Sequence, residues 1–566
     1  MTMGVVEKFT KEVLATIDAP RLSSIPIPSR RTIMHNLSSV IFLRKIIQTM
    51  TPNFSSPKRK TNYTIHSFID KQLKIIKEAS QGVPLSILLQ MKYQLYSQLP
   101  PEAKELRMSI TPQSLEKFSN VDLESLGKIT EELQSIDWVA STIGDVKSDE
   151  QSSVRRITGS YYTPRKLVDF SLKQSFDPHL TRISKNRNTQ SMQKLMICDP
   201  ACGDGAFLLA IASHIARRES KNVKKTQEEH FLEVFQTQIH GADLNPIALF
   251  SLAAQAWILS GRPNLSIGKF LANFRCGNSL LWCKKKDVSD QNYSSAENFY
   301  DKEMSKTKLK EIVLKNGIFQ WNLEFPEIFS HGGFDVVIGN PPWERVKFQL
   351  REFFRPYENL LPEKVTNQKK RDQLREELLA NNPDLKMAYD NGKSSSEKMS
   401  RFLTKSGEYP LTGSGDVNLY SVFAELSQSL VRIGGLISLI IPTKIATGKN
   451  NQNFFEPLIT EQRLMTCLDI ENKRLFNNVH SHERFSVFSF TSIGSKKLHS
   501  GPMVSSMLNG SKPDTWAKEK IRIKWSDFKR FNPNSKSIIL PSTKDDYELL
   551  SIAYANCPIL WRGYCP

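Results

Sequence analysis

The chain has 566 residues, of which 39% are hydrophobic and 24% charged, a balance typical of folded globular proteins rather than of disordered chains. At roughly 150 residues per domain, this length predicts about three or four domains that can bury a core without disulfides or a metal. The net charge of +19 favours a polyanionic partner, usually nucleic acid, although a merely basic globular protein would show the same surplus.

The cysteines and the N-terminus indicate a cytoplasmic protein. Seven scattered cysteines form neither a CxxC pair nor a zinc-ligand spacing, so we expect reduced thiols and no metal site. The N-terminal segment carries acidic residues and has no long apolar stretch, which argues against a signal peptide. The most apolar run, 433–442, is too short to cross a membrane and predicts a buried strand.

Apolar spacing predicts the elements in chain order. Residues 1–150 are polar, and three- and four-residue apolar spacing in 67–79 and 84–99 predicts helices. From about 155, short apolar runs alternate with amphipathic segments, which predicts an α/β fold with a parallel sheet. The first predicted elements are a strand at 194–199, a helix at 205–218, a strand at 237–243, a helix at 246–260 and a strand at 334–340.

The second half of the chain interrupts this pattern and then resumes it. Residues 344–412 form a charged, mainly helical stretch that resembles an insertion, and the α/β pattern returns in 417–492. After about 495 the chain is rich in Ser, Lys and Pro, with short strand-like pieces. We therefore expect a helical N-terminal region (1–150), an α/β core (151–495) and a C-terminal region (496–566).

A glycine loop, Asp-Pro-Ala-Cys-Gly-Asp-Gly at 199–205, follows a predicted strand and opens a predicted helix. Gly203 and Gly205 let the backbone approach a ligand closely. The start of the helix offers free N–H groups to a carboxylate or a phosphate. A tight strand-to-helix turn without a ligand is the other interpretation.

A carboxylate, Asp243, ends the next predicted strand within Gly-Ala-Asp-Leu-Asn-Pro at 241–246. In doubly wound folds, an acidic residue at this place binds ribose hydroxyls. Asp243 follows Gly205 at more than the roughly 20 residues of the dinucleotide fingerprint, which argues against NAD. A helix cap ahead of Pro246 is the alternative interpretation.

A third motif, Asn340-Pro341-Pro342-Trp343, ends the strand at 334–340. Consecutive prolines cannot continue a sheet ladder, so they fix the backbone and leave carbonyl oxygens unpaired. The oxygens of Asn340 and Pro341 can accept the hydrogens of a planar aromatic amine whose ring stacks on Trp343. In isolation, the motif is also compatible with an ordinary strand-terminating turn.

With these motifs in this order, the chain resembles the S-adenosylmethionine-dependent N6-adenine DNA methyltransferases, in particular the type IIG-like methylases of restriction-modification systems. The resemblance covers about 155–545. It implies a Rossmann-like class I methyltransferase core with a mixed, mostly parallel sheet, and a helical insertion at 344–412. The motifs that carry it are GSYYTP (159–164), DPACGDG (199–205), GADLNP (241–246), CGNSLL (276–281) and GNPPW (339–343).

In that family the core usually continues into a long target-recognition domain. Residues 496–566 are therefore expected to be the start of a target-recognition or C-terminal region, in a short, truncated or split form. Independent sequence-specific activity depends on which of these forms is present.

The resemblance also implies the roles of individual residues. Asp243 would bind the ribose of S-adenosylmethionine, Leu244 would lie against its adenine ring, and Asn278 would approach its adenine edge, unless Asn278 caps its own loop. The implied cofactor-binding residues are Thr163, Pro164, Asp199, Ala201, Gly203, Gly205, Asp243, Leu244 and Asn278. The implied catalytic residues are Asn340, Pro341, Pro342 and Trp343.

The target base must leave the duplex before it can react. Trp343 would stack on one face of the flipped base and Phe485 on the other, although Phe485 is equally compatible with a buried strand position. His480 and His482 lack a third ligand at a suitable spacing, so we interpret them as loop residues. Lysine-rich segments at 221–225, 284–286 and 369–371 are candidate phosphate contacts.

The expected function is site-specific methylation of adenine N6 in double-stranded DNA, within a restriction-modification or phage-defence system. A separate specificity or nuclease subunit is compatible with the short C-terminal region, and no membrane partner is expected. The alternatives are methylation of RNA adenine, of DNA cytosine at N4 or of protein glutamine. A methylase-derived DNA-binding subunit without independent activity is a further alternative.

Overall fold

The computed structural model describes residues 36–43, 46–47, 50, 61–79, 82–92, 94–95, 107–110, 163–184, 195–219, 225–282, 320–354, 368–473, 475–476, 479, 481–518, 520–532 and 537–556.

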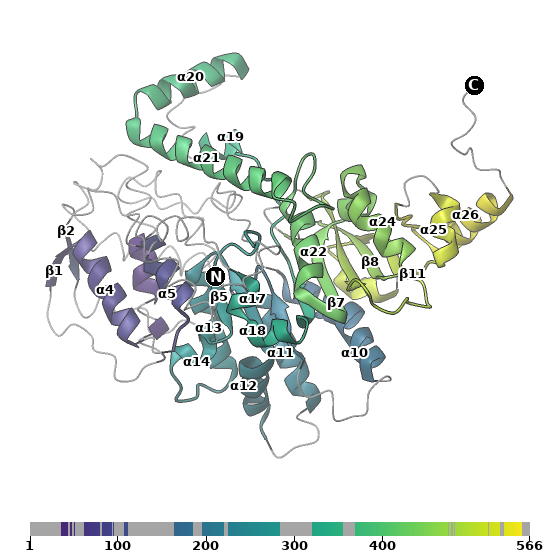
Figure 1. Cartoon of the computed structure of the whole chain (residues 1–566), viewed down its shortest axis with the longest axis horizontal. Coiled ribbons are helices and arrows are strands. Elements are labelled where there is room, and N and C mark those ends of the chain that lie inside the picture. The colour runs from purple at the N-terminus through teal and green to yellow at the C-terminus, as the bar shows by residue number, and fades with distance from the viewer. Residues whose placement is uncertain are drawn as a thin grey trace.

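A mixed sheet lies at the centre of the described structure (Figure 1). Its strands run in the order β11-β10-β8-β9-β7-β6-β3-β4-β5. Most neighbours are parallel, whereas β9 is antiparallel to β7 and β8 and β11 is antiparallel to β10, so the predicted mostly parallel sheet is confirmed. The strands are β3 (Ile197–Asp199), β4 (Ile239–Asp243), β5 (Phe274–Cys276), β6 (Phe334–Gly339), β7 (Val431–Pro442), β8 (Leu464–Glu471), β9 (Arg484–Thr491), β10 (Met503–Asn509) and β11 (Ile521–Arg522).

The strand order reverses between β3 and β6. From β3, the chain adds β4 and β5 on one side, and then β6 and β7 on the other. In open α/β sheets, ligands bind outside the carboxyl ends of the strands at such a switch point. Asp199 is the last residue of β3, and Asn340 directly follows β6. The sheet therefore brings the first and the third predicted motifs to this point.

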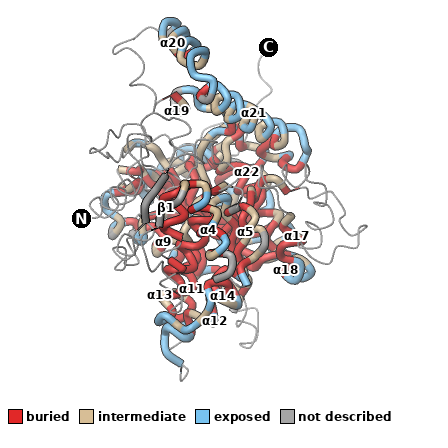
Figure 2. The backbone as a smooth tube through the Cα atoms, turned by 90° about the vertical axis from the view of Figure 1, so that its left-hand side faces the viewer, coloured by how far each residue is buried: buried red, intermediate tan, exposed pale blue. Residues whose placement is uncertain are grey.

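Helices cover both faces of the sheet, so the buried core consists of two hydrophobic clusters. Figure 2 shows buried residues through the middle of the molecule and exposed residues along α20 and α21. Along β6, Val336 and Ile338 pack in one cluster and Val337 in the other, as the alternation of side chains along a strand requires. The first cluster includes helices α9 (Arg165–Ser171), α10 (Asp177–Ser184), α11 (Ala206–Glu219), α12 (Gln227–Gln238), α13 (Pro246–Leu259) and α14 (Ile267–Leu271), and the π-helical turn η3 (Leu172–Phe176). The second includes α17 (Trp321–Glu324), α18 (Pro326–Ser330), α22 (Leu419–Leu430), α23 (Lys444–Thr447) and α24 (Gln452–Thr460).

The predicted core elements are confirmed within a few residues. The strands expected at 194–199, 237–243 and 334–340 are β3, β4 and β6, and the helices expected at 205–218 and 246–260 are α11 and α13. The apolar run at 433–442 belongs to β7, which is buried as predicted except near its start, where Ile433 is 70% exposed.

The helical insertion predicted at 344–412 forms an arm that projects from the sheet (Figure 1). Its two ends pair with each other: Val346 N–H donates to the Val417 carbonyl (3.0 Å), and Leu419 N–H donates to the Glu344 carbonyl (2.9 Å). We call these paired segments, 344–347 and 416–419, the neck. The arm contains α19 (Leu350–Phe354), α20 (Gln368–Ala380) and α21 (Pro383–Lys405).

The sheet continues past residue 495, the predicted end of the core. β10 pairs in parallel with β8, and β11 pairs antiparallel with β10. These two strands correspond to the short strand-like pieces expected there. The helices α25 (Trp525–Phe531) and α26 (Lys544–Asn556), which follow them, were not predicted.

The N-terminal helices predicted at 67–79 and 84–99 correspond to α4 (Ile65–Ala79) and α5 (Leu85–Lys92). Nearby, β1 (Thr61–Thr64) pairs antiparallel with β2 (Arg107–Ile110). Helix α5 lies against β5 and α13, and the Cys276 N–H donates to the Ser86 hydroxyl (3.4 Å). Helix α5 therefore covers the outer edge of the sheet beside the second motif.

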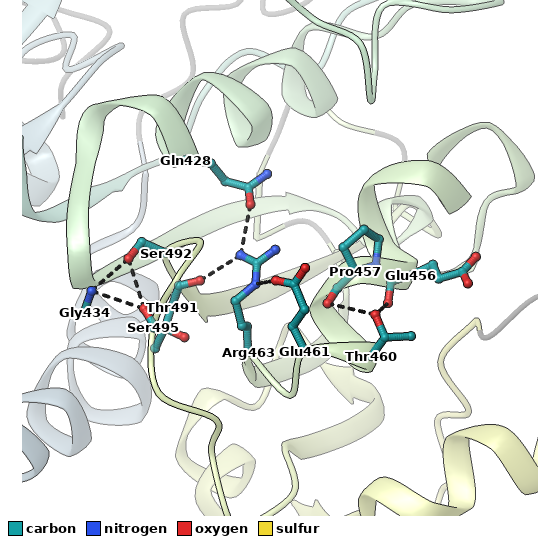
Figure 3. A network of polar contacts seen from close by, with 10 residues as sticks. All are labelled: Gln428, Gly434, Glu456, Pro457, Thr460, Glu461, Arg463, Thr491, Ser492 and Ser495. Atoms are coloured by element: carbon teal, nitrogen blue, oxygen red, sulfur yellow. Dashed lines mark hydrogen bonds and ion pairs between the residues drawn. The ribbon is translucent and has the colours of Figure 1, made fainter.

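A buried arginine joins three elements at the sheet edge opposite the motifs (Figure 3). Arg463, directly before β8, donates from Nη1 to the Gln428 side chain of α22 and to the Thr491 carbonyl of β9, both at 3.0 Å. Its Nε donates to Glu461 (2.7 Å). This network fixes the amino-terminal end of β8 and leaves the carboxyl-terminal edge for the site.

Four described cysteines, Cys198, Cys202, Cys276 and Cys467, carry free thiols, as predicted. Burial raises the pKa of each of these thiols, which keeps them protonated and unreactive. Among the helices of the described ranges, none is both long and apolar enough to span a bilayer.

Candidate active site

The glycine loop forms a tight turn between β3 and α11. The Cys202 N–H donates to the Ala242 carbonyl of β4 (3.0 Å), and the Gly205 N–H donates to the Cys202 carbonyl (2.9 Å). Gly203 and Gly205 have φ angles of +53° and +88°, in the left-handed region that favours glycine. A Cβ added at Gly205 would lie 2.5 Å from the Leu252 side chain, whereas one added at Gly203 would meet no atom within 4 Å. Gly205 is therefore required for packing, and Gly203 borders open space.

The half-buried carboxylate of Asp243 connects the loop to the end of β4. Its Oδ2 accepts the Gly203 N–H and its Oδ1 accepts the Asn245 N–H, both at 2.8 Å. Burial raises the pKa of Asp243 despite these hydrogen bonds. The cap of α13 is Asn245, whose side chain accepts the Ile247 N–H (3.0 Å), so the alternative reading of Asp243 as the helix cap is wrong.

The carboxyl group of Asp199 is buried at the switch point. Its Oδ1 accepts the Ala201 N–H (3.0 Å). Burial raises its pKa to about 8; the hydrogen bond from Ala201 opposes this rise, and the negative charge of Asp243 adds to it. Gly339, at the end of β6, lies directly against this carboxyl group, because a Cβ there would be 2.4 Å from Oδ1.

The side-chain amide of Asn340 is oriented by two partners. Its Nδ2 donates to the Thr163 hydroxyl (3.1 Å), and its Oδ1 accepts the indole N–H of Trp343 (3.0 Å). An indole nitrogen is only a donor, so the oxygen of the amide must face Trp343. The same indole N–H also reaches the Ile440 carbonyl of β7 (3.2 Å). Thr163 and Trp343 together fix which way the amide points.

The ring of Trp343 packs against two buried phenylalanines. Its centroid lies 5.3 Å from that of Phe476 and 5.5 Å from that of Phe485, and these two rings are 5.2 Å apart. Phe485 is fully buried on β9, with its ring against that of Trp343. Phe485 thus occupies the buried strand position that was its alternative, and its base-stacking role stays a prediction.

The loop that carries Asn278 is held from three sides. The Ser279 hydroxyl donates to the Pro200 carbonyl (2.5 Å), the Trp321 indole donates to the Ser279 carbonyl (3.1 Å), and the Tyr409 hydroxyl donates to the Leu280 carbonyl (2.7 Å). Asn278 itself accepts the Leu280 N–H (3.1 Å), as a loop-capping residue does.

The amide nitrogen of Asn278 faces the arm. It contacts the Met399 sulfur of α21 at 3.9 Å. The base of the arm therefore packs on the loop for which a cofactor contact was predicted, and that contact remains a prediction.

The structure brings most of the predicted residues to one edge of the sheet. Thr163 contacts Asn340, Gly203 contacts Asp243, and the 51% exposed side chain of Leu244 follows Asp243. Pro164 precedes α9, Ala201 and Pro342 are half-buried, and Pro341 is buried.

Several expectations fall outside the described residues, namely 159–162, 221–224, 284–286 and His480. His482 lies in a turn and contacts Glu471 (2.9 Å), which agrees with its interpretation as a loop residue. Across the described ranges, no group of three or more His, Cys, Asp or Glu side chains could hold a metal ion.

Sequence reasoning missed Phe476, Met399 and Tyr409 in this region, and it named Gly339 in the GNPPW motif without giving it a role. For Gly339 there was a signal, because a glycine directly before the Asn-Pro-Pro motif suggests a close approach of the backbone. The other three lie far from the motifs in sequence, and we find no local pattern that marks them.

Two family models match overlapping parts of the chain. Residues 150–268 match the N-6 DNA Methylase family, and residues 237–376 match the Eco57I restriction-modification methylase family. These ranges include the three motifs whose geometry is described above. The resemblance to the adenine-specific methylases of restriction-modification systems is therefore confirmed for residues 150–376.

Individual relatives are distant and longer than this chain. The adenine-specific methyltransferase PglX of Streptomyces coelicolor is 26% identical over 217 residues, which are 37% of this chain and 16% of that protein. The DrdV–DNA complex shares 12% identity at a TM-score of 0.45, over 92% of this chain and 42% of that one. A nuclease-deletion mutant of the type ISP restriction-modification enzyme LlaGI, bound to a DNA substrate mimic, shares 11% identity at a TM-score of 0.46, over 92% and 36%. The chain thus spans less than half the length of each.

Proposed function

We propose that this chain transfers a methyl group from S-adenosylmethionine to the N6 amine of adenine at specific sites in double-stranded DNA, within a restriction-modification or phage-defence system. The observation that carries the proposal is the oriented amide of Asn340 at the switch point of the sheet. It lies one strand from Asp199, which ends β3. The methylase family matches over the same residues support the same reaction.

The residues around the switch point fit the chemistry of S-adenosylmethionine. The open space beside Gly203 allows a ligand to approach the loop backbone. Asp243 offers a carboxylate for ribose hydroxyls, and the exposed side chain of Leu244 offers an apolar surface for an adenine ring. Asp199 offers a carboxyl group at the switch point for the amino-acid end. When bound, this cofactor supplies an electrophilic methyl group.

The chemistry of the amine explains why Asn340 and the prolines are needed. The N6 lone pair of adenine is delocalised into the ring, so the amine is a poor nucleophile. An amide oxygen has two acceptor positions, and the indole of Trp343 uses one at Asn340. The second position, together with the Pro341 carbonyl, can accept both amine hydrogens and localise the lone pair on nitrogen. The same oxygens stabilise the positive charge that develops on nitrogen during transfer.

The test uses the purified chain, tritiated S-adenosylmethionine and unmodified genomic DNA of mixed sequence. Digested DNA is analysed for N6-methyladenine. Label in that nucleoside that disappears in Asn340→Ala, with cofactor binding retained, would support the proposal. Asn532→Ala is the matched control, because the Asn532 amide bonds to Ser537 in the C-terminal region. This control should keep wild-type activity.

Other outcomes would replace the proposal. Label in N4-methylcytosine would assign the cytosine amine instead. Label that appears in RNA or in protein glutamine, but not in DNA, would change the substrate class. Cofactor binding without label in any of these substrates would favour a methylase-derived subunit that requires a partner for activity.

A further inference from the structure

A fully buried carboxylate near the carboxyl end of β8 has no role in the glycine loop, in the Asn340 network or in the cofactor contacts. Asp469 is 0% exposed. It accepts hydrogen bonds from the Thr443 hydroxyl (2.5 Å), the Met507 N–H (2.8 Å) and Arg484 Nε (3.0 Å), and its second ion-pair contact is with Arg484 Nη2. A buried carboxylate is costly unless it is saturated in this way. This set of donors indicates an anchor that holds the arginine.

The anchored arginine is itself accessible. The side chain of Arg484 is 40% exposed. Asp469 engages its Nε and Nη2 in a bidentate pair, so the planar guanidinium is held in one orientation. For Nη1, the described part of the chain supplies no hydrogen-bond partner. Arg484 therefore keeps donors for a ligand while its geometry is fixed by the protein.

Arg484 lies at the same edge of the sheet as Asn340 and Trp343. It is the first residue of β9, which runs antiparallel to β7, so that Phe485 pairs with Pro442 at the end of β7. The Phe485 ring contacts Trp343. Because side chains alternate along a strand, Arg484 lies on the opposite face of β9 from Phe485. The guanidinium thus lies at the same edge of the sheet as the proposed base-binding region, but on the face of β9 away from the Phe485 ring.

The nearby carboxylates do not compete for an incoming anion. Glu471 pairs with Lys473 and His482, both at 2.9 Å. Glu483 pairs with Lys444 (3.2 Å). Each of these two acidic groups has its own cation, so neither draws on Arg484. Asp469 does, through Nε and Nη2, and leaves Nη1 of the guanidinium to face a phosphate.

We propose that Arg484, anchored by Asp469, contacts a DNA phosphate beside the extruded adenosine and acts as a positioning residue for methyl transfer. This inference rests on the proposed function. An arginine that is held by a buried partner loses little side-chain freedom when it binds, which suits a contact that must hold a strained, flipped nucleotide. Such a contact fixes the strand without reading its sequence.

A matched pair of double variants tests this role in the full chain. Asp469→Asn with Arg484→Gln removes both charges, so no buried charge is left unpaired. The control is Asp335→Asn with Arg432→Gln, which removes a similar pair at the amino-terminal ends of β6 and β7. For each protein we would measure binding to mixed-sequence duplex DNA over a series of salt concentrations, the KM for DNA, cofactor affinity and thermal unfolding.

The expected result is specific to the Arg484 pair. The slope of log K against log salt should become shallower by about 0.9, the value for one lost phosphate contact. The KM for DNA should rise about tenfold, with unchanged cofactor affinity. The control pair should leave the slope and the KM at wild-type values. Arg484→Lys alone should keep the slope, because the lysine keeps the positive charge. It should weaken DNA binding, because an ammonium group cannot reproduce the paired hydrogen bonds of the planar guanidinium.

Failure of this inference can be distinguished from failure of the proposed function. A wild-type slope for the folded Arg484 double variant would overturn the phosphate contact, even if the wild-type chain methylates adenine. If the wild-type chain binds DNA without methylating it, the salt slopes still decide the role of Arg484. If the wild-type chain does not bind DNA at all, the inference is also overturned.

Discussion

The side-chain nitrogen of Asn340 donates to the hydroxyl of Thr163, 177 positions earlier in the chain, at 3.1 Å. This contact joins the segment before α9 to the proposed catalytic motif after β6. Because the Trp343 indole holds the oxygen of the same amide, neither amide atom can rotate without losing a hydrogen bond. The orientation of the proposed acceptor thus depends on a residue that also lies in the proposed cofactor region.

Replacement of the Thr163 hydroxyl should slow methyl transfer. Thr163→Val preserves the shape of the side chain but removes the acceptor for Asn340, so the amide loses one of its two fixed contacts. We expect kcat to fall by about tenfold, the effect of leaving a partly buried donor unsatisfied. Thr163→Ser keeps the hydroxyl and should remain near wild type. Steady-state methylation assays would check this, and equal rates for Val and Ser would contradict it.

The two functions of Trp343 can be separated. Trp343→Phe keeps an aromatic face but removes the N–H that reaches Asn340 and Ile440, so we expect a severalfold loss in kcat with a small change in the KM for DNA. Trp343→Ala also removes the stacking surface, which is worth roughly 1–3 kcal/mol per base. Single-turnover rates with both variants would measure the difference. If the Trp343→Phe and Trp343→Ala variants were equally slow, the indole N–H would make the dominant contribution of Trp343 to the rate.

Alanine substitutions at the two loop glycines should have different effects, one on stability and the other on cofactor binding. Gly205→Ala places a Cβ 2.5 Å from Leu252 at a φ of +88°, so we expect the free energy of unfolding to fall by about 2 kcal/mol or more. Gly203→Ala has open space and a φ of +53°, so the fold should lose only about 1 kcal/mol. Its methyl group would instead occupy the proposed cofactor space.

Cofactor titration and thermal unfolding of both proteins would check this pair. Gly203→Ala should weaken cofactor binding while it unfolds near the wild-type temperature, and Gly205→Ala should unfold early. The reverse pattern would mean that the proposed space beside Gly203 is not where the cofactor lies.

The raised pKa of Asp199, about 8, predicts a pH dependence of stability in the cofactor-free protein. An unfolded Asp has a pKa near 3.9, so between about pH 4 and pH 8 the folded state binds this proton and the unfolded state does not. The contribution of the Asp199 carboxyl group to the free energy of unfolding therefore declines as pH rises through that window, by up to about 1.4 kcal/mol per pH unit.

Asp199→Asn removes this titration. Thermal unfolding of both proteins between pH 5 and pH 8, without cofactor, should show the wild type losing stability relative to the variant as pH rises. A constant difference across this range would show that the carboxyl group does not stay protonated in the folded protein.

Local sequence patterns predicted the elements that carry the motifs, because their signals are contained within short segments. Burial on both faces makes residues 336–339 of β6 a continuous apolar run, and Pro341 and Pro342 mark where the strand must end. Asp199 and Asp243 were placed correctly at strand ends for the same reason.

Contacts between distant segments could not be predicted in this way. Met399 reaches Asn278 across 121 positions, and the position of β9 between β7 and β8 depends on pairing that no local pattern records. Phe485 has an apolar strand pattern whether it faces a ligand or the core, so its burial against Trp343 required the structure. Helix α26 was missed because the surrounding Ser, Lys and Pro residues suggested irregular chain.

The paired segments of the neck make the arm a cooperative unit that can open separately from the sheet. Glu344 and Leu419 bring the start and the end of the insertion together immediately after the proposed catalytic motif, so strand order and register do not depend on what lies between them. Local opening of α20 and α21 would expose mostly surface residues and would leave the sheet intact. Amide hydrogen exchange should therefore show the arm and the sheet as two cooperative units, with the arm exchanging first.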